Sequence, residues 1–358
     1  MKANDAIIWS CGIINIVDDG FWFVPYEQNL LCRFSIEKNL VDDIFELDMN
    51  PFQVESFDNV YQINNKVFMI PAFEKYMHVF DMNQRNIQLV NIPEYTGAGG
   101  KFLLGHQYEE WLYLFPSFFD KIIKVNVSTL EMEEVLTKSE DWHNEFVNMV
   151  VKDNKAYLVN KENKIYLFDF ESEELSVVYQ FKDISGLRTV SIWNDKLIVT
   201  GEKGKTFVYD LIEKKETLFA EYGIEFIGSY CVDSFLFLVP ILEKDFFLRV
   251  NLEDRCLQKI KLCRKDRYQQ RPHHPAFSRP CVYRDCLYFF NTQYRTLIKY
   301  NYLTEKLEEN CIMIEPVSIT RDILNDWLHR ETEAGNSLIE GNGPYTTLNN
   351  LIAYCINN

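Results

Sequence analysis

The hydrophobic and polar positions of this chain repeat with a near-constant step. In each copy an apolar run meets a polar turn, a second apolar run ends in Asp, Asn or Ser, and a third run follows another turn. Residues 66–92, KVFMIPAFEKYMHVFDMNQRNIQLVNI, show the pattern most clearly. The residues that close the second run are Ser35, Asp81, Asn126, Asp169, Asp210, Asn251 and Asn301. Their spacing of 41 to 50 residues is typical of β-propeller repeats.

A fourth apolar run precedes most copies and completes a predicted blade. It begins with an aromatic residue or Leu, at Phe57, Phe102, Phe146, Leu187, Phe226 and Phe277. Polar doublets such as Asn64-Asn65 and Asp153-Asn154 separate it from the next run. Asn and Asp tolerate the left-handed backbone of tight hairpin turns. Each unit therefore predicts four antiparallel strands joined by short turns, which is one propeller blade.

The sequence predicts an all-β fold, a seven-bladed β-propeller of four-stranded antiparallel blades over residues 1–315. A single four-stranded sheet cannot bury both of its faces, whereas blades stacked in a ring bury them against each other. Runs such as residues 235–239 and 287–290 are almost continuously apolar, which fits strands covered on both faces. The pattern leaves open a sandwich or an open solenoid of hairpins.

In architecture the chain resembles the kelch, WD and related bacterial propellers over about residues 11–315. Its blades have no consistent Trp-Asp pair at their ends and no recurrent Gly-Gly pair as in kelch. The Ser-x-Asp-x-Gly-x-Thr box of sialidases is also absent. The resemblance implies a propeller fold and no particular activity, because one fold hosts many functions.

Residues 316–358 have a different pattern, which predicts a short helical extension. Thr320 is a candidate N-cap, and the apolar residues within 323–328 share one helix face. A second helical pattern occupies residues 348–355. We expect this extension to pack on the propeller with Trp327 buried. The alternative is an appendage that binds a partner.

Composition narrows the classes of partner and compartment. The net charge of −16 argues against nucleic-acid binding, which usually needs a basic face, and against anionic membranes. No apolar run is long enough to span a membrane, and no secretory signal is evident. The nine cysteines include no Cys-x-x-Cys and lie mostly in apolar patterns, as in a reducing compartment. We expect a cytoplasmic monomer without nucleic-acid or membrane partners.

The connection 263–279 reverses the sign of this acidic chain and is the predicted binding site. In a propeller, the connections between blades and the turns between second and third strands emerge on one face. Arginine suits carboxylates because its planar fork donates two hydrogen bonds at once. The candidate ligand-binding residues on this face are Arg267, Arg271, His273, His274, Trp142 and His143. The alternative is that the arginines pair with the protein's own carboxylates and that the Trp ring packs on a neighbour.

Catalytic and metal-binding motifs are not found in the sequence. The six histidines form no His-Glu-x-x-His, no cluster has metal-ligand spacing, and no Gly-x-Ser-x-Gly elbow occurs. We therefore predict no metal and no cofactor. The preferred hypothesis is a non-enzymatic binding or scaffold propeller that recognises a protein, peptide or anionic glycan through one ring face. The alternative is a lyase or hydrolase that acts on a carbohydrate or other anionic substrate at the central mouth.

Overall fold

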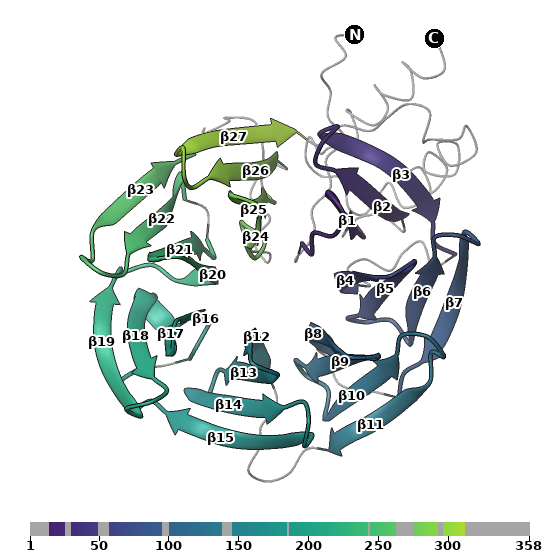
Figure 1. Cartoon of the computed structure of the whole chain (residues 1–358), viewed down its shortest axis with the longest axis horizontal. Coiled ribbons are helices and arrows are strands. Elements are labelled where there is room, and N and C mark those ends of the chain that lie inside the picture. The colour runs from purple at the N-terminus through teal and green to yellow at the C-terminus, as the bar shows by residue number, and fades with distance from the viewer. Residues whose placement is uncertain are drawn as a thin grey trace, which may run out of the picture.

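The computed structural model describes residues 14–25, 30–48, 57–94, 100–137, 145–184, 186–242, 244–262, 275–292 and 296–311. Their strands form seven antiparallel sheets arranged in a ring (Figure 1). Six of these sheets have four strands and one has three. In every sheet the strands follow chain order from the axis to the rim. The predicted all-β, seven-bladed β-propeller is confirmed.

The first four blades contain strands β1 to β15. Blade 1 contains β1 (Gly20–Phe23), β2 (Leu30–Ser35) and β3 (Leu40–Glu46). Blade 2 contains β4 (Phe57–Ile63), β5 (Lys66–Pro71), β6 (Tyr76–Asp81) and β7 (Asn86–Asn91). Blade 3 contains β8 (Phe102–Tyr108), β9 (Trp111–Pro116), β10 (Lys121–Asn126) and β11 (Met132–Thr137). Blade 4 contains β12 (Phe146–Lys152), β13 (Lys155–Asn160), β14 (Lys164–Asp169) and β15 (Glu174–Gln180).

The last three blades contain strands β16 to β27. Blade 5 contains β16 (Thr189–Trp193), β17 (Lys196–Thr200), the 3₁₀-helix η1 (Glu202–Gly204), β18 (Lys205–Asp210) and β19 (Lys215–Glu221). Blade 6 contains β20 (Phe226–Val232), β21 (Phe235–Pro240), β22 (Phe246–Asn251) and β23 (Leu257–Lys261). Blade 7 contains β24 (Cys281–Tyr283), β25 (Cys286–Asn291), β26 (Thr296–Asn301) and β27 (Lys306–Cys311).

The innermost strands begin later than predicted in blades 5 and 7, and blade 1 has three strands in place of the predicted four. In blade 1 the predicted innermost strand, which would precede β1, is reduced among the described residues to an isolated bridge between Val17 and Gly20. β16 begins two residues after the predicted start at Leu187, and β24 begins four residues after the predicted start at Phe277. Phe277 instead forms an isolated bridge with Asn291. The apolar pattern therefore begins before the hydrogen-bonded ladder in these blades.

The polar residue that closes each repeat holds the outer turn of its blade. The Oδ1 atom of Asn126 accepts hydrogen bonds from the backbone N–H groups of Ser128 and Thr129, both at 2.9 Å. Asp81 holds the corresponding turn of blade 2 in the same way. The fourth turn residue adopts a left-handed backbone in all seven blades, at Asn39, Arg85, Leu130, Glu173, Lys214, Arg255 and Glu305. The repeat keeps Asp, Asn or Ser at this position because a short side-chain acceptor stabilises the turn.

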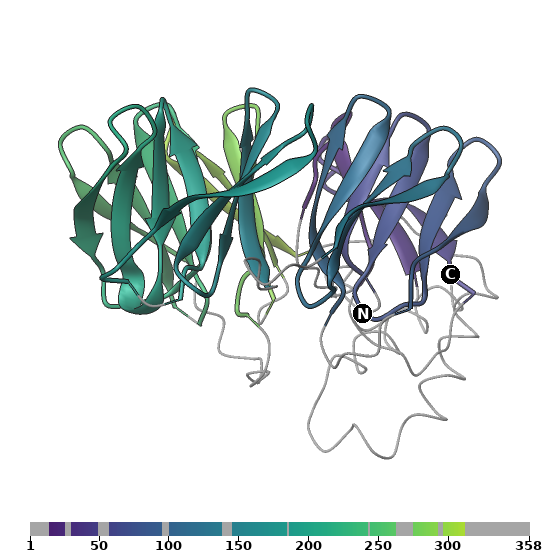
Figure 2. The same cartoon turned by 90° about the horizontal axis from the view of Figure 1, so that it is seen from below.

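Successive strands run antiparallel, so the turns alternate between the two faces of the ring. The turns between first and second strands, and between third and fourth strands, form what we call the hairpin face. The turns between second and third strands, together with the connections between blades, form the connection face. In Figure 2 the short hairpin turns lie along the upper edge, and η1 lies at the lower edge on the connection face. The predicted sharing of one face by these connections and turns is confirmed for the described strand ends.

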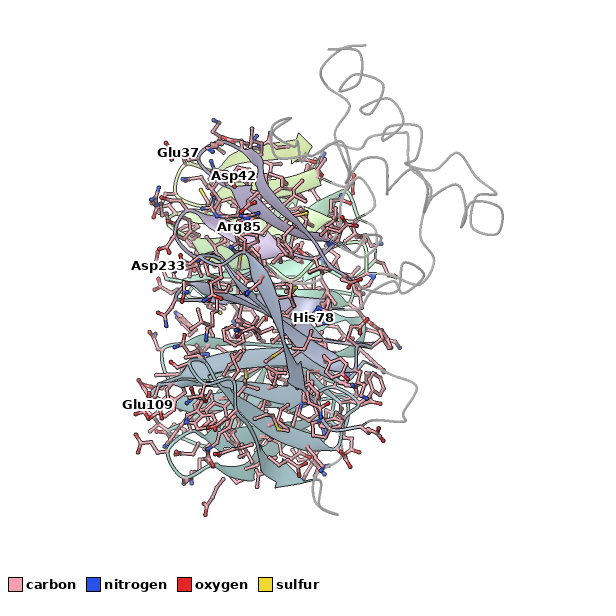
Figure 3. The ribbon with its side chains drawn as sticks, turned by 90° about the vertical axis from the view of Figure 1, so that its right-hand side faces the viewer. Glu37, Asp42, His78, Arg85, Glu109 and Asp233 are labelled. Carbon is pink, nitrogen blue, oxygen red and sulfur yellow. The ribbon has the colours of Figure 1, made fainter. Side chains whose placement is uncertain are left out.

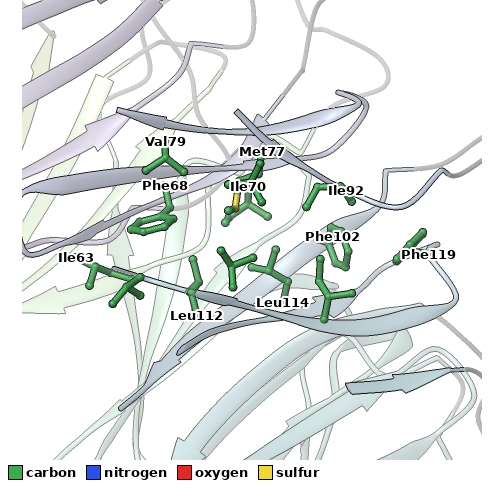
Figure 4. Packing of buried hydrophobic residues seen from close by; sticks show 14 residues of the cluster. Ile63, Phe68, Ile70, Met77, Val79, Ile92, Phe102, Leu112, Leu114 and Phe119 are labelled. Carbon is green, nitrogen blue, oxygen red and sulfur yellow. The ribbon is translucent and has the colours of Figure 1, made fainter. Parts of the chain in front are cut away.

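The core consists of apolar layers between neighbouring blades. Between blades 2 and 3, Phe68 and Ile70 of β5 face Leu112 and Leu114 of β9 (Figure 4). All four side chains are fully buried. Burying each such side chain contributes about 1.5–3 kcal/mol relative to leaving it exposed. Blade-on-blade packing therefore supplies the main force that holds the ring.

The ring closes between blades 7 and 1 by side-chain packing. Each of these blades consists of consecutive strands, so no strand is exchanged among the described residues. Phe21 of β1 contacts Phe290 of β25 at a centroid distance of 5.8 Å. Near the axis, the Asp19 carboxylate accepts a hydrogen bond from the Tyr283 hydroxyl at 2.6 Å and pairs with Arg284 at 2.7 Å.

The predicted helical extension, residues 316–358 with Trp327, lies outside the described residues. Its docking on the propeller, and the division between it and a propeller of residues 1–315, stay predictions. Among the residues that the structure describes, no helix is long and apolar enough to cross a membrane.

Candidate functional site

All six predicted ligand-binding residues lie outside the described part of the chain: Trp142, His143, Arg267, Arg271, His273 and His274. Their roles stay predictions. Thr137 and Glu145 flank the segment that contains Trp142 and His143. Leu262 and Pro275 flank the segment that contains the other four residues. All four follow or precede strand ends on the connection face. The anchor points of both segments therefore share the predicted face.

The described end of the basic connection is fixed to blades 6 and 7. The backbone N–H of Ala276 donates to the Ile241 carbonyl at 2.9 Å, and the N–H of Ser278 donates to the Phe290 carbonyl at 2.9 Å. The Ser278 hydroxyl accepts a hydrogen bond from the Phe290 N–H at 2.8 Å. These bonds position the next residue, Arg279, at the mouth of the ring.

Arg279 is the one basic residue of this connection that the structure describes, and it reaches the far side of the axis. Its guanidinium donates a hydrogen bond to the carbonyl oxygen of Val147 on β12 of blade 4. Val147 is the extra residue of a β-bulge, so its carbonyl is free from the strand ladder. Behind it, Pro280 packs against Gly228 of β20, where a Cβ atom would lie 2.2 Å from Pro280 Cδ. The Arg279 side chain therefore spans the mouth on the connection face.

A polar network joins Asn15, which precedes β1, to the innermost strands of blades 2 and 3 near the axis. The Asn15 amide donates to Asn59 Oδ1 at 2.6 Å, and the Asn59 amide donates to the Tyr61 hydroxyl at 2.7 Å. The Tyr61 hydroxyl donates in turn to the Gly105 carbonyl at 2.8 Å. Burial raises the pKa of Tyr61 to about 12, although the hydrogen bonds with Gly105 and Asn59, and to a smaller extent the charge of Arg279, oppose the shift. The phenol is therefore protonated at neutral pH and serves as a fixed donor.

The sequence reasoning missed this network. One signal was available, because Asn148 occupies the position in blade 4 that Asn59 occupies in blade 2. Both amide oxygens accept a hydrogen bond from the N–H of the following residue, at 2.8 and 2.9 Å. A polar residue that recurs at one repeat position inside an apolar strand indicates a local geometry that the two blades share, here the bulge of the innermost strand.

Exposed apolar side chains lie on turns of the connection face. Phe73 lies in the turn of blade 2, Phe118 in that of blade 3 and Leu242 in that of blade 6. The Lys161 ammonium of blade 4 lies 5.6 Å from the centroid of the Phe118 ring and pairs with Glu145 at 2.9 Å. Aromatic rings beside cations can supply contact area for a partner. Single exposed apolar residues are also normal on a protein surface.

The hairpin face is densely acidic. Figure 3 shows Glu37, Glu109 and Asp233 along this face, with His78 nearer the opposite one. The acidic residues of its turns are Asp18, Asp19, Glu37, Glu109, Glu110, Glu131, Asp153, Glu171, Glu173, Asp195, Glu213, Asp233, Glu253, Asp254, Asp285 and Glu305. The basic residues of the same turns are Lys38, Arg85, Lys214, Arg255 and Arg284.

The described turns and connections of the opposite face are nearly balanced in charge. Their acidic residues are Asp48, Glu74, Glu94, Asp120, Glu145, Glu162, Asp183, Glu202, Glu225 and Asp245. Their basic residues are Lys75, Lys101, Lys161, Lys182, Arg188, Lys203, Lys244 and Arg279. Among the described turns and connections, the excess of negative charge therefore lies on the hairpin face.

Within the described residues, no group of three or more His, Cys, Asp or Glu side chains lies close enough together to hold a metal ion. The cysteines described there form no disulfide bond: Cys32, Cys231, Cys256, Cys281 and Cys286. Burial raises the pKa of Cys231 to about 12, so its thiol is not a ready nucleophile at neutral pH.

Comparison with known proteins relates this chain to others by fold alone. No protein-family model and no curated protein matches it. Among solved structures, BamB from Moraxella catarrhalis matches with a TM-score of 0.55 at 10% identity, over 82% of this chain and 85% of BamB. The computationally designed Ika8 protein matches with a TM-score of 0.52 at 7% identity, over 87% of this chain and 98% of Ika8. At such identities the likeness indicates a shared fold and no shared activity.

Proposed function

We propose that this protein is a non-enzymatic binding or scaffold propeller that recognises an acidic protein or peptide segment, or an anionic glycan, through its connection face. The observation that carries the proposal is the difference between the two faces. The hairpin face consists of short capped turns rich in carboxylates. The connection face has balanced charge, exposed Phe73 and Phe118, and a basic connection that Arg279 anchors across the mouth.

The chemistry of the connection favours an acidic partner. Long loops on a rigid scaffold commonly carry binding residues. Arg267 and Arg271 can each donate two hydrogen bonds to a carboxylate or sulfate group, and His273 adds a further donor. The acidic hairpin face would repel the same partner, so association through the connection face is also favoured at long range. Trp142 is the proposed stacking surface.

Two further features belong to the proposal. The described cysteines form no disulfide bond, which supports a reducing compartment such as the cytoplasm. Asn15, Asn59 and Tyr61 are hydrogen-bonded to one another, and Tyr61 is protonated at neutral pH. These groups favour a structural role at the mouth over general acid–base catalysis, which needs a group with a pKa near the working pH.

Binding of fluorescent poly-L-glutamate, measured by anisotropy over a salt series, tests the proposal. The test variant is Arg267→Ala with Arg271→Ala. The matched control is Arg255→Ala, which removes an exposed arginine from the hairpin face. We expect the double variant to bind more weakly by about tenfold or more, with an unchanged melting temperature, because each lost charge-assisted bond contributes about 1.5–3 kcal/mol.

Two results would contradict the proposal. If the double variant loses stability while its affinity stays at the wild-type value, the arginines pair with the protein's own carboxylates. If wild type and both variants fail to bind poly-L-glutamate and a sulfated glycan at low salt, the connection face is no receptor for anionic partners.

A further inference from the structure

A glutamate from the following blade completes a charged row at the seam between blades 3 and 4. Tyr113, Lys124 and Glu133 lie side by side on β9, β10 and β11. Glu173, the fourth residue of the outer turn of blade 4, accepts a hydrogen bond from the Tyr113 hydroxyl at 2.7 Å. The Lys124 ammonium also binds Glu173, at 2.8 Å. The carboxylate of one blade thus neutralises the lysine of its neighbour.

The seam between blades 6 and 7 has the same design. Arg249 on β22 holds the position of Lys124, and it forms an ion pair and hydrogen bond with Glu305. Glu305 is again the fourth residue of the outer turn in the following blade. The Arg249 guanidinium also lies 3.9 Å from the ring centroid of Phe235. A third-strand cation bound by a fourth-turn glutamate is therefore a recurrent device of this ring.

At the closing seam between blades 7 and 1, blade 7 has the same row of Tyr, Lys and Glu, but blade 1 supplies no glutamate from its outer turn. Tyr288, Lys299 and Glu308 lie side by side on β25, β26 and β27, the same residue types as in blade 3. The fourth turn residue of blade 1 is Asn39, which is shorter and uncharged. Asn39 accepts a hydrogen bond from the Asn310 amide at 3.4 Å.

A cleft of about 300 Å³ opens at this seam. It is lined by Phe34, Ile36, Glu37, Asn39, Tyr288, Leu297, Lys299, Glu308 and Asn310. The Lys299 ammonium lies 3.7 Å from Glu308, which is closer to Lys306 at 2.8 Å. The Lys299 side chain is 34% exposed, compared with 13% for Lys124. The cleft therefore combines apolar lining residues with a loosely paired ammonium group.

We propose that this cleft binds a carboxylate supplied by residues 312–358 of the same chain. Asn310 lines the cleft, and β27 ends one residue later, at Cys311. The next residues are Ile312, Met313 and Ile314, and the first carboxylate is Glu315. Five extended residues span about 17 Å, which is ample to return to Lys299 from Asn310.

The composition of the segment fits the cleft. The apolar residues 312–314 suit the apolar side chains in the lining of the cleft, which are Phe34, Ile36 and Leu297. Two carboxylates can share one lysine here, because Glu133 and Glu173 both pair with Lys124 at the seam of blades 3 and 4. An occupant bound in this cleft would contact both blade 7 and blade 1, because residues of both blades line it.

Native-state trypsin cleavage of the full chain tests this proposal. Arg321 and Arg330 are cleavage sites inside the segment. Asn39→Glu supplies an internal carboxylate, and its backbone (φ of 56°) matches that of Glu173 and Glu305 (57° and 58°). We expect cleavage at both arginines to be about tenfold faster in Asn39→Glu, since one charge-assisted hydrogen bond corresponds to about that factor. Asn39→Gln is the matched control, because glutamine is uncharged and equal in size to glutamate. It should retain the wild-type cleavage rate.

Circular dichroism confirms that each variant is folded before its cleavage is compared. Lys299→Met removes the ammonium without supplying a carboxylate, and it should accelerate cleavage as Asn39→Glu does. Equal cleavage rates in wild type, Asn39→Glu and Lys299→Met would overturn the proposal. If the rates are equal and acetate raises the melting temperature of wild type but not of Asn39→Glu, the cleft binds a free carboxylate and the proposed occupant is wrong.

Discussion

His78 lies at the third position of β6, where other blades carry apolar or aromatic residues such as Ile123 and Phe207. Its side chain is buried, with 5% of its surface exposed, and its ring packs on Phe57 at a centroid distance of 5.1 Å. Nδ1 has no hydrogen-bond partner among the described residues. Burial lowers the pKa of His78 to about 4. The imidazole is therefore neutral in the folded protein at physiological pH.

This burial predicts a loss of stability in mild acid. As pH falls through 6.5, His78 in the unfolded chain gains a proton, whereas the folded protein does not bind one until about pH 4. The contribution of His78 to the free energy of unfolding is therefore constant above pH 6.5 and falls below it, by about 2 kcal/mol at pH 5. We expect His78→Phe, which copies Phe207, to lose about 2 kcal/mol less than wild type between pH 7 and pH 5 in urea unfolding. An identical loss in both proteins would show that His78 is not the titrating group.

At the scale of elements, one capped turn is repeated around the hairpin face. The side-chain oxygen of the closing residue replaces a backbone acceptor for two N–H groups, and the fourth residue takes a left-handed backbone. The cap explains why closing residues are restricted to Asp, Asn and Ser while the turn residues vary widely. The cap does not use the side chain of the fourth residue, so this side chain can form an ion pair with the preceding blade, as those of Glu173 and Glu305 do.

Replacing one cap isolates its contribution. Asn126→Ala removes the acceptor of the two hydrogen bonds at 2.9 Å and should lower the free energy of unfolding by about 1 kcal/mol. Asn126→Asp is the control, because Asp holds this position in blades 2, 4 and 5 and should preserve stability. Urea denaturation of both variants checks the prediction. Equal stability of wild type and Asn126→Ala would mean that the turn does not depend on its cap.

The sequence predicted the elements well because each strand and turn is encoded within a few residues. The apolar runs give the strands, and the closing residues give the turns. The strand starts at Leu187 and Phe277 were wrong because both side chains are fully or almost fully buried outside the ladder. An apolar pattern reports burial, and it cannot separate a buried connection from a buried strand.

The candidate site was less predictable because its contacts are remote in sequence. Arg279 meets Val147 across 132 positions, and Tyr61 meets Gly105 across 44. No local pattern encodes such pairs, and the bulge that frees the Val147 carbonyl is visible only in the strand register. The proposed roles of Arg267, Arg271 and Trp142 stay predictions, since these residues lie outside the described part of the chain.

At the scale of the whole molecule, the ring is a single layer of seven blades with two unlike faces. Apolar layers between blades hold it, and between blades 7 and 1 this packing is joined by the polar contacts of Asp19 with Tyr283 and Arg284. The antiparallel order of each blade sends short turns to the hairpin face and long connections to the other. The acidic hairpin face and the basic connection thus follow from where the topology places each stretch of sequence. A partner that carries negative charge should meet the connection face.

Amide hydrogen exchange with and without poly-L-glutamate at low salt tests this most directly. We expect slower exchange in peptides that cover residues 262–280 and 137–145, because bound ligand shields the connections that flank the mouth. Peptides that cover the hairpin turns at residues 82–85 and 211–214 should exchange at unchanged rates. Protection confined to these hairpin turns, or unchanged exchange at 262–280 under saturating poly-L-glutamate, would contradict recognition through the connection face.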